Sequence, residues 1–95
     1  MKRNDIPKKG DVYRHFKQKD YLILNTNVTH SETKERMILY QALYGHHDIY
    51  VRPYDMFMSP VDKEKYPDVK QVWRFEKVDP LNAIYDDEAK EKEQS

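Results

Sequence analysis

The sequence predicts an all-β protein, a small antiparallel barrel or sandwich of about five strands. Short runs of β-branched, aliphatic and aromatic residues follow one another at intervals of about a dozen residues, with turn residues between them and few helix signals. Closure into a barrel would remove the exposed edges that so small a sheet otherwise presents. The 95 residues allow a single domain with one modest core, and no cysteine is present to cross-link it.

The first two predicted strands form the beginning of this sheet. Residues 11–16 follow Gly10, which suits a tight entry turn, and their alternation places Tyr13 and His15 on the same face. Residues 20–30 begin with β-favouring apolar side chains and then become polar. This second strand is therefore expected to run out to an exposed end.

The middle of the chain predicts a central strand and a neighbour. Residues 36–44 are apolar on both faces, and their isoleucine and tyrosines favour a strand over a short helix without a capping residue. Gly45 supplies a turn into the strand at 49–53, which Pro53 ends.

Less regular segments follow. Residues 54–62 are predicted to form a short extended or 3₁₀ segment, residues 62–71 a polar loop and residues 72–78 the last strand. The tail predicts a frayed helix after Pro80 and then disorder. The expected organisation is a basic N-terminal segment at 1–9, a single β-barrel domain at 10–78 and an acidic tail at 79–95.

Charge and composition narrow the function classes. Seventeen basic and seventeen acidic residues give a formal net charge of zero, so the protein lacks the global positive field of a sequence-independent nucleic-acid binder. The basic N-terminal segment leaves local contacts with RNA open. The N-terminal residues lack the apolar stretch of a leader, and no run approaches a membrane span, so a cytoplasmic protein without a membrane partner is expected.

His30, Ser31 and Glu32 are the residue types of a hydrolase triad. As sequence neighbours their side chains point to alternate sides of an extended segment and do not converge, and Ser31 has no flanking glycines. Serine, threonine and carboxylate side chains instead bond nearby backbone N–H groups in turns. The stretch therefore predicts a tight turn between two strands.

No metal or cofactor is predicted. The four histidines lack the spacing of zinc motifs, and Gly10 and Gly45 stand alone, so there is no glycine-rich phosphate loop. Tyrosines interleaved with arginines provide stacking planes and planar cations, which suit a base, a methylated cation or an anion. Most of these rings are also expected to form the core of so small a barrel.

Four stretches of the sequence resemble motifs of a known protein family. GDVYRHFKQKDYLIL, HSETKERMILYQALYG, YVRPYDMFMSPV and RFEKV resemble the bacterial domain-of-unknown-function family 1653, over residues 10–61 and 73–78. The resemblance implies no particular activity. Two departures stand out: Gln18 replaces the usual glycine, and residues 62–72 form a longer linker than the family pattern has.

The shared polar motif residues suggest one polar network. A carboxylate and a guanidinium form strong bidentate bonds, so Glu32 is predicted to pair with Arg52 or Arg14 and to pin the 30–35 loop against the barrel.

The favoured interpretation is an SH3-like barrel that acts as a non-catalytic binding module for RNA, a peptide or a small anionic metabolite. Two alternatives stay open. One is a small enzyme that uses His30 or His15 with Glu32 as acid and base; the other is a structural homodimer or protein-interaction domain. The predicted ligand-binding residues are Tyr13, Arg14, His15, His30, Glu32, Tyr40, Tyr50 and Arg52.

Overall fold

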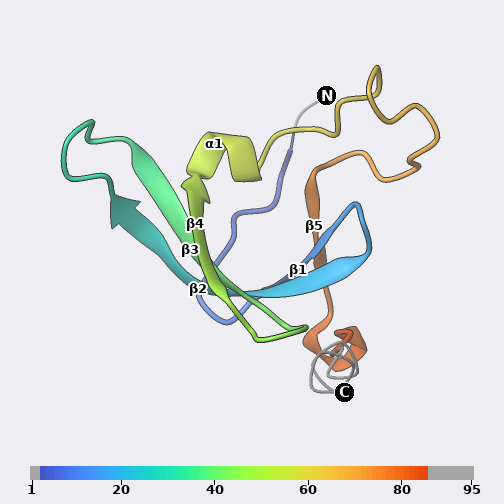
Figure 1. Cartoon of the computed structure of the whole chain (residues 1–95), viewed down its shortest axis with the longest axis horizontal. Helices are drawn as coiled ribbons and strands as arrows, with labels where there is room; N and C mark the ends of the chain where they lie inside the picture. The colour runs from blue at the N-terminus through green and yellow to red at the C-terminus, as the bar shows by residue number, and fades with distance from the viewer. Residues whose placement is uncertain (1–2, 86–95) are drawn as a thin grey trace.

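The computed structural model describes residues 3–85 and confirms the all-β class. Five antiparallel strands form one strongly curved sheet in the order β4-β3-β2-β1-β5 (Figure 1). The strands are β1 (Val12–His15), β2 (Lys19–Thr29), β3 (Arg36–Ala42), β4 (Ile49–Pro53) and β5 (Phe75–Val78), and the helices are the single turn α1 (Tyr54–Phe57) and the 3₁₀ helix η1 (Pro80–Asn82).

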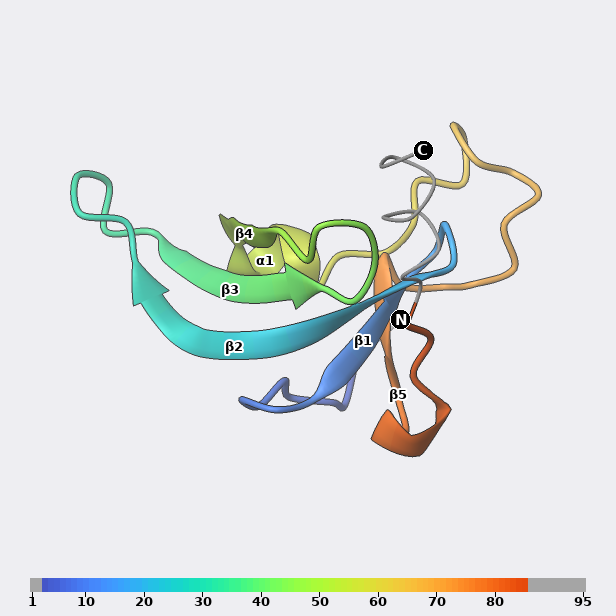
Figure 2. The same ribbon diagram turned by 60° about the horizontal axis from the view of Figure 1, so that its bottom comes forward.

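The expected barrel does not close, because β4 and β5 remain the two ends of the sheet. Pro53 ends β4, and α1 follows it directly and lies across the concave side of the sheet (Figure 2). Phe57 of α1 stacks on Phe75 of β5, with ring centroids 4.0 Å apart and an interplanar angle of 9°. Side chains carried by α1 thus fill the gap that strand pairing would otherwise close.

The core lies on this concave face. Tyr13 of β1 pairs with Tyr21 of β2, so alternate residues of neighbouring strands point to the same side of the sheet. Burial of these large apolar groups against α1 is the main stabilising contribution to the fold. The buried cluster consists of Tyr13, Ile23, Ile38, Tyr40, Phe57 and Phe75.

Two predicted segments differ from the structure. Residues 54–57 form a turn of α-helix rather than an extended or 3₁₀ segment, and the N–H of Met58 donates to the carbonyl of Tyr54. The last strand begins at Phe75 instead of residue 72. The Glu76 carboxylate accepts the N–H groups of Val72 and Trp73, which bends the chain before the strand starts.

Both ends of the described chain dock on the sheet instead of extending into solvent. The Arg3 guanidinium lies 4.9 Å from the centroid of the Trp73 ring and pairs with Asp5, which accepts the Tyr13 hydroxyl at 2.8 Å. At the other end, η1 stands where a frayed helix was expected, and its N-cap Asp79 accepts the N–H of Leu81. The predicted disorder of the last ten residues lies outside the described residues.

Gln18 lies in the β1–β2 turn with φ +70°, where the family pattern has glycine. A left-handed backbone costs a non-glycine residue about 1 kcal/mol, and the exposed Gln18 side chain offers only a long 3.4 Å bond to the Phe16 carbonyl in return. Gln18→Gly is therefore expected to raise the free energy of unfolding by about 1 kcal/mol, measured by urea denaturation. Asn27→Gly, at an exposed position in β2, is the control and should destabilise the protein. A Gln18→Gly variant that is less stable than the wild type would contradict the backbone strain at position 18.

Candidate anion-binding site

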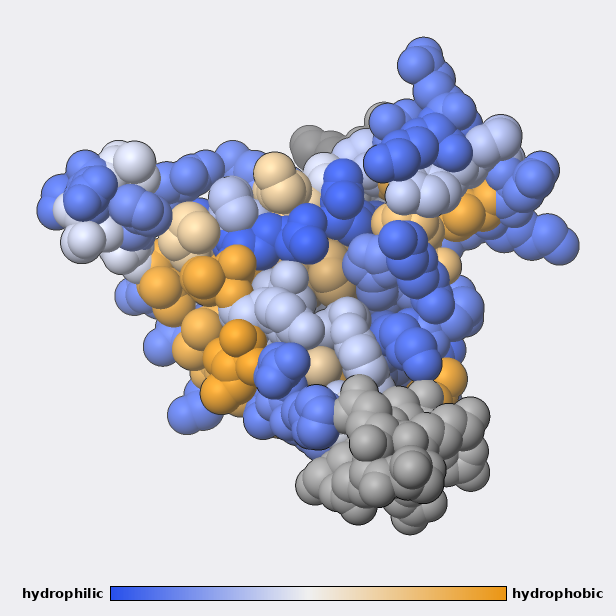
Figure 3. Space-filling model, viewed as in Figure 1, coloured by the Kyte–Doolittle hydropathy of each residue, from blue (hydrophilic) through white to orange (hydrophobic). Residues whose placement is uncertain are grey.

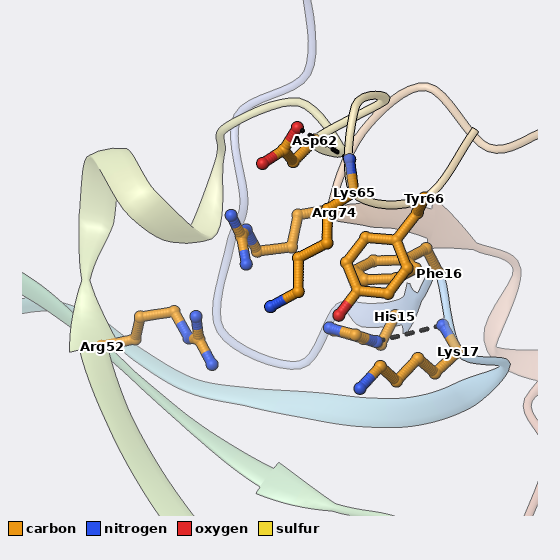
Figure 4. Close-up of a pocket in the computed structure, with 8 residues that line it drawn as sticks. All are labelled: His15, Phe16, Lys17, Arg52, Asp62, Lys65, Tyr66 and Arg74. Carbon is orange, nitrogen blue, oxygen red and sulfur yellow. Dashed lines mark hydrogen bonds between the residues drawn. The ribbon is translucent and has the colours of Figure 1, made fainter. Parts of the chain in front are cut away.

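A polar pocket of about 300 Å³ opens where β1, β4 and the loop at 62–71 meet (Figure 4). One wall comes from the end of β1 and the turn after it, another from β4, and the loop forms the third. The lining residues are His15, Phe16, Lys17, Arg52, Asp62, Lys65, Tyr66 and Arg74.

His15 is the central group of this pocket. Its ring stacks on Phe16, with centroids 4.3 Å apart, and packs edge-on against Phe75 at 4.9 Å. The backbone N–H of Lys17 donates to Nδ1 at 3.0 Å, so the neutral ring carries its proton on Nε2. Figure 4 shows the two nitrogens on opposite sides of the ring, with Nε2 directed toward the interior of the pocket. The ring is therefore oriented as a donor toward any ligand there.

The surroundings of His15 disfavour its protonation. Burial, together with the positive charges of Arg52, Lys17 and Arg74, lowers the pKa of His15 to about 4, and burial is the largest cause. At neutral pH His15 is consequently an uncharged N–H donor. The repulsion also reports a positive potential at the position of the ring.

Two arginines project into the pocket from separate elements (Figure 4). Arg52 of β4 donates from Nε to the Tyr40 hydroxyl at 3.1 Å, and Arg74, just before β5, donates from Nε to Oγ of Ser59 at 3.2 Å. These bonds fix the base of each guanidinium, so the outer nitrogens are held in place toward the cavity. A planar fork held in this way matches the oxygens of a phosphate or carboxylate.

The loop adds charge and an aromatic ring. Lys17 and Lys65 lie with Nζ 5.8 and 5.5 Å from the centroid of the Tyr66 ring, which packs against Phe16 at 4.9 Å. Among residues 3–85, Asp62 is the single acidic lining residue, and its Oδ1 accepts the N–H groups of Glu64 and Lys65. Four cationic side chains against one carboxylate give the pocket a local positive excess in a chain of zero net charge.

The loop is fixed by its own hydrogen bonds. Lys63 donates from Nζ to the carbonyls of Val69 and Gln71, and the Gln71 amide donates to the carbonyls of Arg14 and Trp73. These contacts tie the loop at 62–71 to β1. They place Lys65 and Tyr66 over the pocket.

Of the predicted site residues, His15, Arg52 and Tyr40 meet at this pocket, with Tyr40 buried beneath Arg52. Tyr50 is 40% exposed, and its ring lies 5.8 Å from that of Tyr40. The other four residues lie elsewhere. Tyr13 is fully buried in the core, Arg14 points to the opposite face and pairs with Asp20, and His30 and Glu32 lie in the exposed β2–β3 turn.

The β2–β3 turn confirms that HSET residues turn a corner. Nδ1 of His30 accepts the N–H groups of Glu32 and Thr33, each at 3.2 Å, and Oγ1 of Thr33 accepts the N–H of Glu35. The Thr33 hydroxyl bonds a backbone N–H as expected, whereas the His30 ring accepts the two N–H groups for which a serine hydroxyl or a carboxylate was expected. Among the described residues Glu32 makes no ion pair with an arginine, so the predicted pairing is wrong: Arg14 is bound by Asp20 and Arg52 by Tyr40.

Sequence reasoning missed most of the pocket. Arg74 stands within the RFE motif, and this was the one available signal for it. The path of the loop depends on distant hydrogen bonds that no local pattern encodes. The missed lining residues are Phe16, Lys17, Asp62, Lys65, Tyr66 and Arg74.

The remaining surface features are few. Strand β4, at the edge of the sheet, exposes Ile49 and Val51 at 58% and 53%, and apolar residues gather on one side of the molecule in Figure 3, apart from the blue polar region around the pocket. This edge is the kind of surface that a homodimer would require.

Within residues 3–85 no three His, Asp or Glu side chains cluster as a metal site would demand, and no helix has the length and apolarity to span a membrane.

Comparison with known proteins gives one match. A family model described as a protein of unknown function, DUF1653, matches residues 11–77. No curated protein and no solved structure matches the chain.

Proposed function

Because the chain belongs to the DUF1653 family, whose description assigns no activity, we propose a function from the site itself: a non-catalytic binding module that holds an anionic ligand in the pocket around His15. The single observation that carries the proposal is the convergence of Arg52, Arg74 and Lys65 on the Nε2 side of His15, with Lys17 beside the ring. All five groups donate hydrogen bonds, and four are charged.

The charge balance favours a small ligand over a long nucleic-acid backbone. The pocket has a positive excess, whereas the chain as a whole is neutral. Counterion-driven binding to a duplex needs an extended basic face. A phosphate or carboxylate group with a compact body suits the pocket better.

The contacts of His15 favour binding over acid–base catalysis. A general base is normally oriented by a carboxylate and has a pKa near the working pH. Here Nδ1 is occupied by a backbone N–H, and the pKa of His15 lies at about 4 because of burial and neighbouring cations. Glu32, the acid partner of the enzyme alternative, lies in the β2–β3 turn at the other end of the long strand β2 (Figure 1).

The test is a titration of ¹⁵N-labelled protein with inorganic phosphate at pH 7.5, followed by NMR. Arg52→Gln and Arg74→Gln should each weaken phosphate binding about 10-fold or more, because a hydrogen bond to a charged group contributes about 1.5–3 kcal/mol. Arg36→Gln removes the same charge from β3, where Arg36 bonds the carbonyl of Thr26, and should bind phosphate like the wild type.

Shifts confined to the pocket, with affinity lost in the two pocket variants alone, would support the proposal. Equal weakening by Arg36→Gln would mean that only net charge matters. Shifts distributed over the surface, or a spectrum that phosphate does not move, would contradict a built site.

A further inference from the structure

We propose that the anion bound at this site is the phosphate of a nucleotide, with its base stacked on Tyr66. The inference rests on the proposed function and names the class of ligand. Its basis is an aromatic plane and a set of cations that line the same cavity.

The size of the cavity is the first argument. The cavity volume of about 300 Å³ lies at the lower end of the range for pockets that enclose small organic ligands. A phosphate group alone would contact only the charged donors of the cavity. Tyr66 and Phe16 line the cavity together with the charged residues. A ligand with an aromatic body beside its anionic group fits this lining.

The position of Tyr66 is the second argument. Phe16, which is buried, packs against the Tyr66 ring at 4.9 Å with a tilt of 56°. The Tyr66 ring lines the pocket and is only partly buried, and Figure 4 shows it beside the charged side chains. A base stacked on an aromatic ring gains about 1–3 kcal/mol, and every base offers a flat face to it.

The distances between ring and charges are the third argument. Lys17 and Lys65 place Nζ within 6 Å of the Tyr66 centroid, and His15, Arg52 and Arg74 line the same cavity. In a nucleotide the sugar places the phosphate to one side of the base, which fits the Tyr66 ring beside a group of cations. In a phosphotyrosine the phosphate extends straight from the edge of the ring, so that ligand needs a narrow pocket with cations at its end.

The experiment compares adenosine 5′-monophosphate with ribose 5-phosphate, which has the same phosphate and sugar but no base. Wild-type protein should bind the nucleotide about 10-fold more tightly, equivalent to 1.4 kcal/mol of stacking. Tyr66→Ala should remove this preference, and Tyr66→Phe should retain it because the ring remains.

Three failures are distinguishable. If ribose 5-phosphate and the nucleotide bind equally to the wild type, the stacking inference is wrong and the anion site stands. If neither ligand nor inorganic phosphate binds, the proposed function itself fails. Tighter binding of a phosphotyrosine peptide than of the nucleotide would overturn the ligand class.

A further experiment distinguishes a free nucleotide from a single-stranded nucleic acid, because both carry a phosphate and a base. A short oligoadenylate that binds more tightly than the mononucleotide, and shifts residues beyond the pocket, would identify the ligand as a single strand. Equal affinity with shifts limited to the pocket would identify it as a free nucleotide. Either result supports the proposed recognition of phosphate and base.

Discussion

Replacing Asp20 by asparagine is expected to lower the free energy of unfolding by about 3 kcal/mol, because breaking a buried ion pair leaves its groups without compensation. Asp20 is 1% exposed. It accepts two bonds from the Arg14 guanidinium, Nε to Oδ1 at 2.8 Å and Nη2 to Oδ2 at 3.1 Å, and a third from the N–H of Ile84 at 2.7 Å. An asparagine side chain has a single acceptor oxygen, and its amide group would face a donor.

Urea denaturation at neutral pH measures this effect. Asp68→Asn, the same change at an exposed position in the loop, is the control and should alter stability by less than about 0.5 kcal/mol. Since Arg14 also donates to the carbonyl of Asn82, the Asp20 variant should loosen the chain around η1, seen as faster amide exchange at Ile84. A loss under 1 kcal/mol would show that the Arg14–Asp20 pair contributes no more than a surface ion pair.

Sulfate is expected to bind about tenfold more tightly at pH 4.5 than at pH 7, with His15 as the main cause. In the free protein burial and the neighbouring cations hold the pKa of His15 at about 4. A bound dianion offsets the charges of Arg52, Lys17 and Arg74, so the pKa of His15 is higher in the complex. A group with a higher pKa in the complex than in the free protein takes up a proton on binding, so affinity rises as pH falls through the higher value.

Sulfate suits this test because it stays doubly charged over the whole range. Asp62 and Lys65 also line the pocket, so the wild type alone does not isolate His15. His15→Gln keeps an N–H donor near the position of Nε2 and removes the titration of the ring. Calorimetry should find most of the pH dependence lost in this variant; an unchanged dependence would show that His15 is not its cause.

The lowered pKa of His15 also makes the stability of the ligand-free protein depend on pH. The unfolded chain protonates His15 near pH 6.5 and the folded protein only near 4, so the unfolded state binds more protons between these values. The contribution of His15 is therefore complete above pH 6.5 and is lost as pH falls toward 4.

The strands were predictable wherever a local signal marks their ends. Pro53 ends β4 at the expected residue, and Gly45, with φ +57°, supplies the expected turn before it. Closure of the sheet was not predictable in this way. The stacking of Phe57 on Phe75 joins residues far apart in the sequence, and that contact places α1 where a closed barrel would pair β4 with β5.

The candidate site was likewise predictable only where a local pattern marks its residues. Strand alternation separates His15, which faces the pocket, from Arg14, which faces Asp20 on the other side, yet composition alone had placed both in one site. Lys65 and Tyr66 reach the pocket because Lys63 and Gln71 bind distant carbonyls. Such contacts form only in the folded chain, so no periodic pattern indicates them.

The most direct test of the anion site is an NMR titration of the His15 ring, followed from pH 8 to pH 3 with and without saturating sulfate. The account predicts a pKa of about 4 for His15 without sulfate and a clearly higher pKa with it. A His15 pKa that is the same in both titrations would contradict a cationic pocket that binds anions beside this ring.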